Sequence, residues 1–306
     1  MPGHVPVLRE EAVRLLVADA QGTFVDATLG HGGHAAAIVA ALSGDAGRVI
    51  GLDCDPEAVE RANAAPPAPA PRFQAARARF SEIDDALDGL GVATVDGLLA
   101  DLGLSSDQLD DPARGLAFSL DGPLDMRLDP SRPETADQLV RRLDERELAR
   151  LLATYGELPR AHAAARALRR AAEATRPLTT RAAREALAPL YRGPGRPRRL
   201  AQAFQALRVA VNREQEELAA LLDVAARRVA PGGTLVVIAY HSLEDRMVKH
   251  AMTPPRPLDA WAAPPESPWI PLTRKPIRPS ADEVAENPRA ASARLRAARR
   301  RGGSPC

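Results

Sequence analysis

The chain has 306 residues and a formal net charge of +1, with 45% hydrophobic and 26% charged residues, which is the composition of a soluble globular protein. Its only cysteines, Cys54 and Cys306, are too few for a cysteine-based metal cluster or a disulfide framework. No run approaches the roughly 18 apolar residues of a membrane-spanning helix, and the first residues lack the pattern of a signal peptide. We therefore expect a cytoplasmic enzyme or binding protein, with no metal and no membrane partner.

The first third of the chain alternates helical patterns with short apolar runs. This alternation indicates βαβ units and a parallel sheet. Pro56 stands where a helix can begin, because a missing N–H is not needed there. The expected helices are Val7–Val17, Gly33–Leu42 and a helix from Pro56, and the expected strands are Thr23–Asp26, Arg48–Asp53, Arg72–Ala75 and Val95–Asp101.

The strand pattern stops after Asp101 and returns with a helix at Asn212–Val229 and a strand at Thr234–Tyr240. We predict one α/β domain, residues 1–108 and 206–306, interrupted by a helical insert, residues 109–205. Nine prolines in Met252–Pro279 predict a segment without regular structure, with Trp261 and Trp269 as packing anchors.

A glycine turn, DATLGHGGH, follows the first expected strand. Gly30, Gly32 and Ala35 satisfy the G-x-G-x-x-G/A dinucleotide pattern, and Asp53 ends the second strand, where an acid can bind ribose hydroxyls. These features suit NAD and S-adenosylmethionine equally. Asp26 favours the methyl donor, because a carboxylate before the turn would repel a pyrophosphate but could hold the cationic methionine part of S-adenosylmethionine.

Longer motifs run from end to end of the sequence. In this order and over nearly the whole chain, they resemble the bacterial 16S rRNA cytosine-N4-methyltransferase family (RsmH, formerly MraW). Three of them, DLGLSSDQLD, GPLDMR and HSLEDR, are long and distinctive. The series is HVPVL (His4–Leu8), VDGLLADLGLSSD (Val95–Asp107), RGLAF (Arg114–Phe118), DGPLDMRLD (Asp121–Asp129), YGE (Tyr155–Glu157), AQAFQALRVAVNRE (Ala201–Glu214), HSLEDRMVK (His241–Lys249) and NPRAASARLR (Asn287–Arg296).

The resemblance implies a class I S-adenosylmethionine-dependent methyltransferase fold, Rossmann-like, with an inserted helical domain. It implies S-adenosyl-L-methionine as cofactor, and as substrate a cytidine in the decoding region (the P site) of 16S rRNA within the 30S subunit. A homodimer is compatible with the family. The family's cofactor contacts fall on Gly32, Gly33 and His34 at the turn, Asp53 at the ribose, Phe80 near adenine, Asp101 and Gln108. From the sequence alone, a core role fits Phe80 better, and only its place in the family's pattern indicates a contact with the cofactor.

The chain departs modestly from the family's usual sequence. GHGGHA stands in place of GRGGHS or GGGGHS, so a small hydroxyl after His34 is missing. AYHSLEDR replaces SFHSLEDR, and YGELPRA replaces YGEERFA, which removes an acid and an aromatic from the insert. None of these changes touches the expected cofactor positions.

The expected reaction needs help at the substrate amine. The exocyclic amine of cytosine is delocalised into the ring, so its lone pair must be made available and a proton must leave. Many amino-methyltransferases use a D/N-P-P-Y/F turn, but here the site reads Asp101-Leu102-Gly103-Leu104. We hypothesise that Asp101, or a backbone carbonyl beside it, accepts a hydrogen bond from the amine. His241 is a second candidate, with a structural role in the neighbouring turn as its alternative.

Basic residues are concentrated in two blocks. Arg160–Arg208 holds twelve arginines against two glutamates, and Ile270–Cys306 holds nine basic and three acidic residues. Such blocks fit a polyanionic partner, and they equally fit helices whose arginines are simply solvated. With the family resemblance, we expect the insert, as RNA-recognition domain, and the tail to hold phosphates. Asp125 and Arg127 are expected to organise the junction of the insert and not to take part in the chemistry. Two alternatives stay open: an NAD-linked oxidoreductase, and a non-catalytic RNA-binding or assembly protein.

Overall fold

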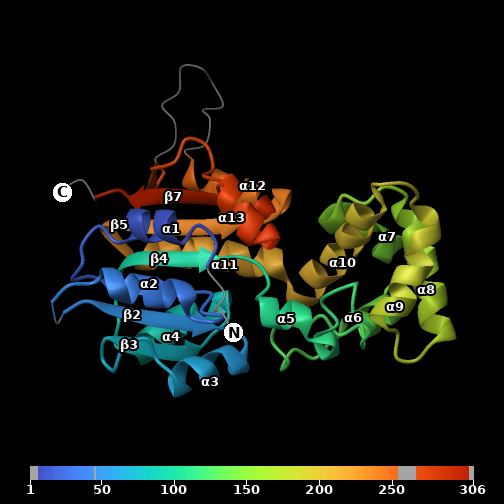
Figure 1. Ribbon diagram of the computed structural model, residues 1–306, viewed down its shortest axis with the longest axis horizontal. Coiled ribbons are helices and arrows are strands. Elements are labelled where there is room, and N and C mark those ends of the chain that lie inside the picture. Colours follow the sequence, from blue (N-terminus) through green and yellow to red (C-terminus); the bar gives the residue numbers. More distant parts are fainter. Residues whose placement is uncertain (1–5, 45, 254–266, 303–306) are drawn as a thin grey trace. The chain divides into compact units, whose positions relative to one another are not determined.

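The computed structural model describes residues 6–44, 46–253 and 267–302. The chain divides into two compact units, which we treat separately (Figure 1). The sheet unit comprises Met1–Gly103 and Glu217–Cys306, and the helical unit comprises Leu104–Glu216. The predicted insert, residues 109–205, lies within the helical unit.

A seven-stranded sheet forms the centre of the sheet unit, in the order β3-β2-β1-β4-β5-β7-β6. The strands β3, β2, β1, β4 and β5 run parallel to one another. The strand β7 is antiparallel to its two neighbours, β5 and β6. This topology confirms the predicted α/β, Rossmann-like fold class. The strands are β1 (Thr23–Asp26), β2 (Arg48–Asp53), β3 (Phe73–Arg77), β4 (Val95–Asp101), β5 (Val229–Ala239), β6 (Trp269–Pro271) and β7 (Arg294–Arg300).

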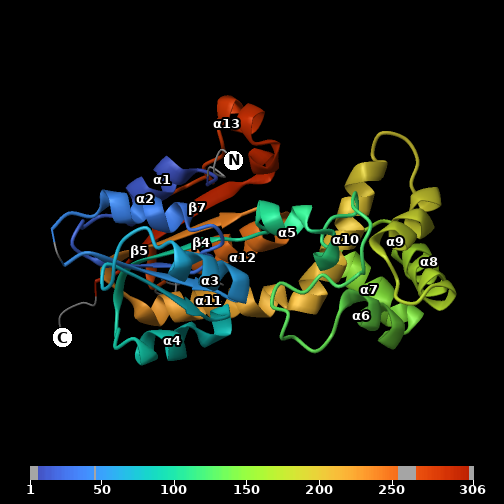
Figure 2. The same ribbon diagram turned by 60° about the horizontal axis from the view of Figure 1, so that its bottom comes forward.

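Helices cover both faces of this sheet (Figure 2). Phe24 and Val25, consecutive in β1, join different core clusters, because alternate strand residues point to opposite faces. One face packs against α1 and α2, and the other against α4, α11 and α12. The elements are α1 (Arg9–Leu16), α2 (Gly33–Ala41), α3 (Pro56–Ala64), η1 (Phe80–Glu82), α4 (Ile83–Gly89), α11 (Glu214–Arg228), α12 (Ser242–Met252), α13 (Ala281–Glu286) and η4 (Pro288–Ser292).

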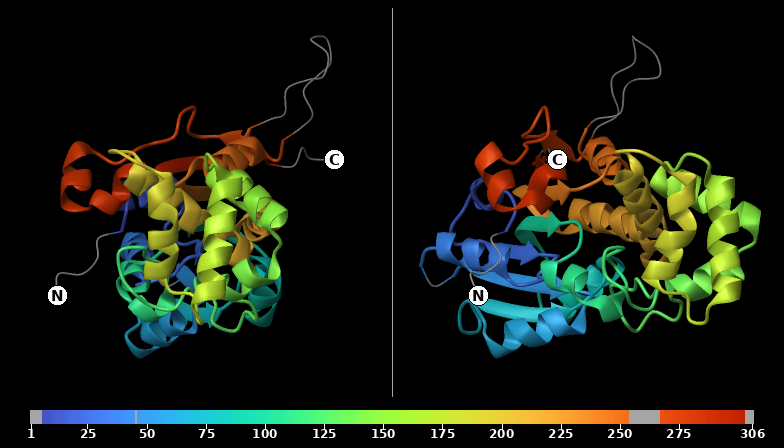
Figure 3. Two further views of the ribbon diagram at one scale, coloured as in Figure 1. Left: turned by 90° about the vertical axis from the view of Figure 1, so that its right-hand side faces the viewer. Right: turned by 45° about the vertical axis from the view of Figure 1, so that its right-hand side comes forward.

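The helical unit has its own buried core of leucine, alanine and a few larger side chains. Figure 3 shows the helices of this unit. Its residues, all of them described, contain no strand, only an isolated bridge between Pro123 and Thr179. Gly156 lets α7 and α10 approach closely, since a Cβ there would lie 2.6 Å from the Gln202 carbonyl oxygen. The elements are α5 (Ser106–Asp110), η2 (Pro112–Arg114), α6 (Ala136–Arg142), α7 (Glu145–Gly156), α8 (Ala161–Ala174), α9 (Thr180–Leu187), η3 (Ala188–Leu190) and α10 (Arg196–Asn212).

The proline-rich segment corrects one prediction. We expected no regular structure in Met252–Pro279, yet β6 forms there and ends the sheet. Pro271 fits because an edge strand does not need every N–H for pairing. Trp269 is a packing anchor, as predicted: it is 1% exposed, with the Arg300 guanidinium 5.9 Å from its ring centroid. Trp261 lies outside the described residues.

The described part of the chain has no helix that combines the length and the apolar character needed to cross a membrane.

Candidate functional site

Three aspartates end neighbouring strands at one edge of the sheet. Asp26 ends β1, Asp53 ends β2 and Asp101 ends β4, and β1 lies between the other two. Parallel strands bring their carboxyl ends to the same edge, which is where ligands bind in open α/β sheets. The sequence predicted a role for each of these residues, and the sheet brings all three to this edge.

The glycine turn connects β1 to α2 in this edge. Gly30 and Gly32 have φ values of +50° and +74°, a region that other residues seldom adopt. Gly32 is the N-cap of α2 and offers no side chain to the first backbone N–H groups of the helix, an arrangement that suits a ligand acceptor. Gly33 has a packing reason to be glycine, because a Cβ would lie 2.4 Å from Pro6 Cγ.

Asp53 fixes this turn to the end of β2. Its Oδ2 accepts a hydrogen bond from the Gly30 N–H at 2.8 Å, and its Oδ1 accepts one from the Asp55 N–H at 2.9 Å. Burial raises the pKa of Asp53 above its ordinary value, and the two N–H donors partly oppose that shift. Each carboxylate oxygen keeps a second lone pair, so the predicted contact with ribose hydroxyls is chemically compatible with these bonds.

Asp26 is the most deeply buried of the three, with no exposed surface. Its Oδ1 accepts hydrogen bonds from the Thr28 N–H at 3.1 Å and the Thr28 hydroxyl at 3.4 Å. Its Oδ2 has no hydrogen-bond partner among the described residues. Burial, with a contribution from the negative charge of Asp53, raises the pKa of Asp26 to about 7. A buried oxygen without a donor is costly, so this atom calls for a cationic or hydrogen-bonding ligand.

Groups from three other segments of the chain surround Asp101. The Tyr240 hydroxyl donates to Oδ1 at 2.8 Å, and the Asp101 N–H donates to the Thr28 hydroxyl oxygen at 2.7 Å. His34 Nδ1 lies 3.8 Å from Oδ2, while its Nε2 is 3.1 Å from the Val7 carbonyl oxygen. Burial raises the pKa of Asp101 to about 7, further raised by the charge of Asp26 and opposed by the Tyr240 hydrogen bond.

The remaining predicted residues occupy other positions. Phe80 begins η1 and packs, half-buried, against the core. Gln108 lies in the helical unit, where it exchanges hydrogen bonds with Ser105 at the start of α5. His241 is the N-cap of α12, and its Nδ1 accepts from the Glu244 N–H at 3.4 Å. This contact agrees with the structural alternative for His241.

Two residues in the site escaped prediction. Thr28 joins Asp26 to the backbone of Asp101, and Tyr240 donates to the Asp101 carboxylate. Thr28 lies inside the glycine turn, two residues after Asp26, where the aspartate side chain typically accepts hydrogen bonds from the residue two positions on. The sequence predicts Tyr240 only as the end of a strand. Its contact with Asp101 depends on the pairing of β4 with β5.

Asp125 and Arg127 form an ion pair inside the helical unit. Arg127 Nε and Asp125 Oδ1 are 2.7 Å apart, and a second guanidinium nitrogen reaches Oδ2 at 2.8 Å. The same guanidinium also donates to the carbonyl oxygens of Pro130 and Arg132. The pair therefore organises its own loop, and these contacts do not reach the junction of the insert that the prediction named.

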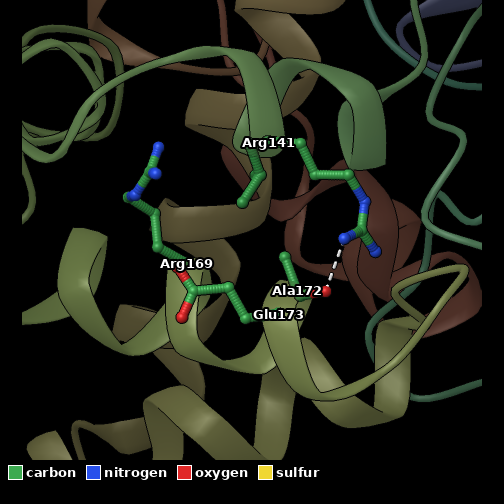
Figure 4. Close-up of a pocket in the computed structure, with 5 residues that line it drawn as sticks. Arg141, Arg169, Ala172 and Glu173 are labelled. Carbon is green, nitrogen blue, oxygen red and sulfur yellow. Dashed lines mark hydrogen bonds between the residues drawn. The ribbon is translucent and has the colours of Figure 1, made fainter.

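A separate cavity of about 210 Å³ lies in the helical unit (Figure 4). Val140, Arg141, Arg169, Ala172 and Glu173 line it. Both guanidinium groups donate to backbone carbonyls, that of Arg141 to Ala172 and that of Arg169 to Leu143. These arginines therefore connect helices of the unit.

Comparison with known proteins gives a consistent result. The family model described as "MraW methylase family" matches residues 1–301. A protein of Sorangium cellulosum named ribosomal RNA small subunit methyltransferase H is 48% identical over 305 residues, covering 98% of this chain and 92% of its own. A protein of the same name from Thermomicrobium roseum is 45% identical over 308 residues, covering 97% and 93%. A solved rRNA methylase from Streptococcus thermophilus matches with a TM-score of 0.41 and 9% identity, covering 96% of this chain and 94% of its own.

Proposed function

Because the chain belongs to the MraW methylase family, we propose that it methylates the exocyclic N4 of cytidine 1402 in small-subunit ribosomal RNA in the cytoplasm. The observation that carries the proposal is the match of the family model over residues 1–301. The relatives' names support small-subunit rRNA as the substrate class. The choice of N4 as the methylated atom, and of cytidine 1402 as the nucleotide, rests on the family resemblance of the sequence motifs.

S-adenosylmethionine is the cofactor of this methyltransferase. It supplies a methyl group on a cationic sulfonium, which a neutral amine can accept. The buried Oδ2 of Asp26, which lacks a described partner, fits a positively charged ligand and would repel the pyrophosphate of NAD. This acceptor favours S-adenosylmethionine over NAD as the ligand. Calorimetry with each of the two cofactors tests that preference.

We assign the cofactor contacts by the chemistry of each residue. Asp26 would face the cationic methionine part, and Asp53 would accept hydrogen bonds from the ribose hydroxyls. Gly32 and Gly33 would allow close approach of the ligand to the backbone at the start of α2, beside His34. Two further contacts, Phe80 with adenine and one through Gln108, rest on the family resemblance.

Asp101 is our candidate for handling the proton of the substrate amine. When the amine nitrogen forms its bond to the methyl carbon, the nitrogen becomes positively charged and must lose a proton. An ionised Asp101 can first accept a hydrogen bond from the amine and then take that proton. A pKa of about 7 suits this exchange near neutral pH. Full turnover by Asp101→Ala at saturating cofactor would rule out this role and leave a backbone carbonyl as the acceptor.

We propose that the RNA meets the helical unit at one arginine-rich segment. Many arginines of this unit are already paired with carboxylates, for example Arg142 with Glu134 and Arg166 with Glu145. Arg192, Arg196 and Arg198 are exposed and have no ion pair within the described residues. No acidic residue occurs in the sequence between Glu185 and Glu214, so their charge is available to phosphates.

The decisive experiment is to incubate the protein with labelled S-adenosylmethionine and 30S subunits that lack the modification. We expect one labelled nucleotide, which mass spectrometry would locate at cytidine 1402 as N4-methylcytidine. Label at another atom or nucleotide would correct the specificity and keep the enzyme class. No transfer, despite measured cofactor binding, would instead favour the non-catalytic RNA-binding alternative.

A further inference from the structure

Tyr240 is the one side-chain hydroxyl that donates to the Asp101 carboxylate within the described residues. It follows the last residue of β5, and its hydroxyl donates to Asp101 Oδ1 at 2.8 Å. Thr28 instead receives its hydrogen bond from the Asp101 backbone.

The ring of Tyr240 is held in place independently of its hydroxyl. It is half-buried and packs against one of the two core clusters of the sheet unit. Gly103 approaches its face, since a Cβ on Gly103 would lie 3.2 Å from two ring carbons. A phenylalanine ring can keep these contacts, so the hydroxyl can be removed while the packing stays.

We propose that Tyr240 is a positioning residue that favours the ionised form of Asp101 and leaves its Oδ2 as the oxygen that receives the substrate amine. The inference rests on the proposed function. The hydroxyl occupies Oδ1 and can only donate, because burial and the nearby Asp101 charge raise the pKa of Tyr240 far above neutral. His34 Nδ1, at 3.8 Å, is beyond hydrogen-bond distance of Oδ2.

Carboxylates near this pair favour protonation of Asp101, whereas His34 would act in the opposite sense when protonated. Asp26 at the end of β1 and Glu244 on α12 act on Asp101 as negative charges. Glu283 on α13 acts in the same sense on Tyr240. The hydroxyl of Tyr240 donates a hydrogen bond that stabilises the ionised form, so its removal must shift Asp101 towards the neutral acid.

The test is the pH profile of Tyr240→Phe on 30S subunits at saturating cofactor. Loss of one hydrogen bond to a carboxylate corresponds to a rise of about one pH unit in the acidic limb. At pH 7 the ionised fraction would fall from about a half to about a tenth, so the rate should drop about fivefold. At pH 9 the rates of the two proteins should agree within about twofold. An equal loss at every pH would overturn the proposal, because it indicates a merely structural role.

A second readout does not depend on turnover. In protein labelled with ¹³C at the aspartate carboxyl, the Asp101 signal is assigned by its absence from Asp101→Asn. Its titration midpoint should rise by about one pH unit in Tyr240→Phe. Tyr191→Phe is the matched control, because the Tyr191 hydroxyl donates to the Pro159 carbonyl in the helical unit. In this variant the titration midpoint of Asp101 should equal that of the wild type.

The two proposals can fail separately. If the wild-type protein does not methylate 30S subunits, the proposed function fails, and the titration still tests the Tyr240–Asp101 contact. If the wild-type protein is active and the Asp101 midpoint is unchanged in Tyr240→Phe, only the inference about Tyr240 is wrong.

Discussion

Asp26→Asn should stabilise the sheet unit at pH 8 while weakening the binding of S-adenosylmethionine. Burial raises the pKa of Asp26 from 3.8 to about 7, so the folded chain binds a proton that the unfolded chain releases between about pH 4 and pH 7. Stability therefore falls as pH rises through that window and stays low above it. Compared with a side chain of unshifted pKa, the raised pKa of Asp26 lowers the free energy of unfolding by about 4 kcal/mol at pH 8 and by about 2 kcal/mol at pH 5.

The asparagine has a cost of its own. Its Oδ1 can keep the hydrogen bond from the Thr28 N–H, but its amide NH₂ would take the place of Oδ2, which has no described partner. A buried amide without a partner costs about 1–3 kcal/mol. We expect a net gain of about 1–3 kcal/mol at pH 8 and a change near zero at pH 5. The difference between the two pH values, about 2–3 kcal/mol, is independent of the amide cost.

Urea unfolding followed by tryptophan fluorescence measures this difference. Trp269 is buried in the core of the sheet unit, and the helical unit contains no tryptophan, so a change in the Trp269 signal reports the sheet unit. Calorimetry on the same variant should show a loss of affinity for S-adenosylmethionine. If the variant and the wild type differed in stability by the same amount at pH 5 and pH 8, Asp26 would have its ordinary pKa, and the argument from burial would be refuted.

Three further predictions concern ligands and packing. The affinity of wild-type protein for S-adenosylmethionine should weaken by up to about tenfold per pH unit below pH 7, because Asp26 becomes protonated. Calorimetry in buffers of different ionisation enthalpy should detect the release of a proton on binding. An affinity that does not change with pH would contradict this prediction. Replacing Arg192, Arg196 and Arg198 by glutamine should lower the salt slope of 30S binding by about 2–3, whereas the same change at the ion-paired, equally exposed set of Arg142, Arg166 and Arg181 should have a smaller effect. Gly33→Ala should destabilise the protein by about 1–3 kcal/mol in thermal unfolding, because its Cβ would displace Pro6; an unchanged midpoint would show that the N-terminal segment yields without cost.

The sequence was sufficient to predict the framework of the site. Asp26, Asp53 and Asp101 end apolar runs of strand type, and alternation with helices predicts that parallel strands bring such ends together. Residue type and place along the chain carry this information without knowledge of any contact. The order of the strands and the position of the edge then follow from the α/β architecture.

Contacts across the sheet could not be predicted in the same way. Tyr240 reaches Asp101 only because β5 pairs with β4 after an insertion of more than a hundred residues, and no local pattern encodes that pairing. The orphaned Oδ2 of Asp26 depends on the full set of neighbours in the fold. In the same way, β6 forms among prolines because β7 provides a partner, a tertiary effect that overrides local propensity.

The late arrival of β5 has a consequence for synthesis on the ribosome. β4 pairs with β1 on one side and with β5 on the other, and β5 begins only at Val229. At about 5–20 residues per second, roughly 6–25 seconds separate the translation of these two strands. Throughout that interval the apolar β4 has an open edge, which is a template for intermolecular pairing. We expect the nascent chain to depend on chaperones at this stage, and slower translation of the helical unit to increase aggregation.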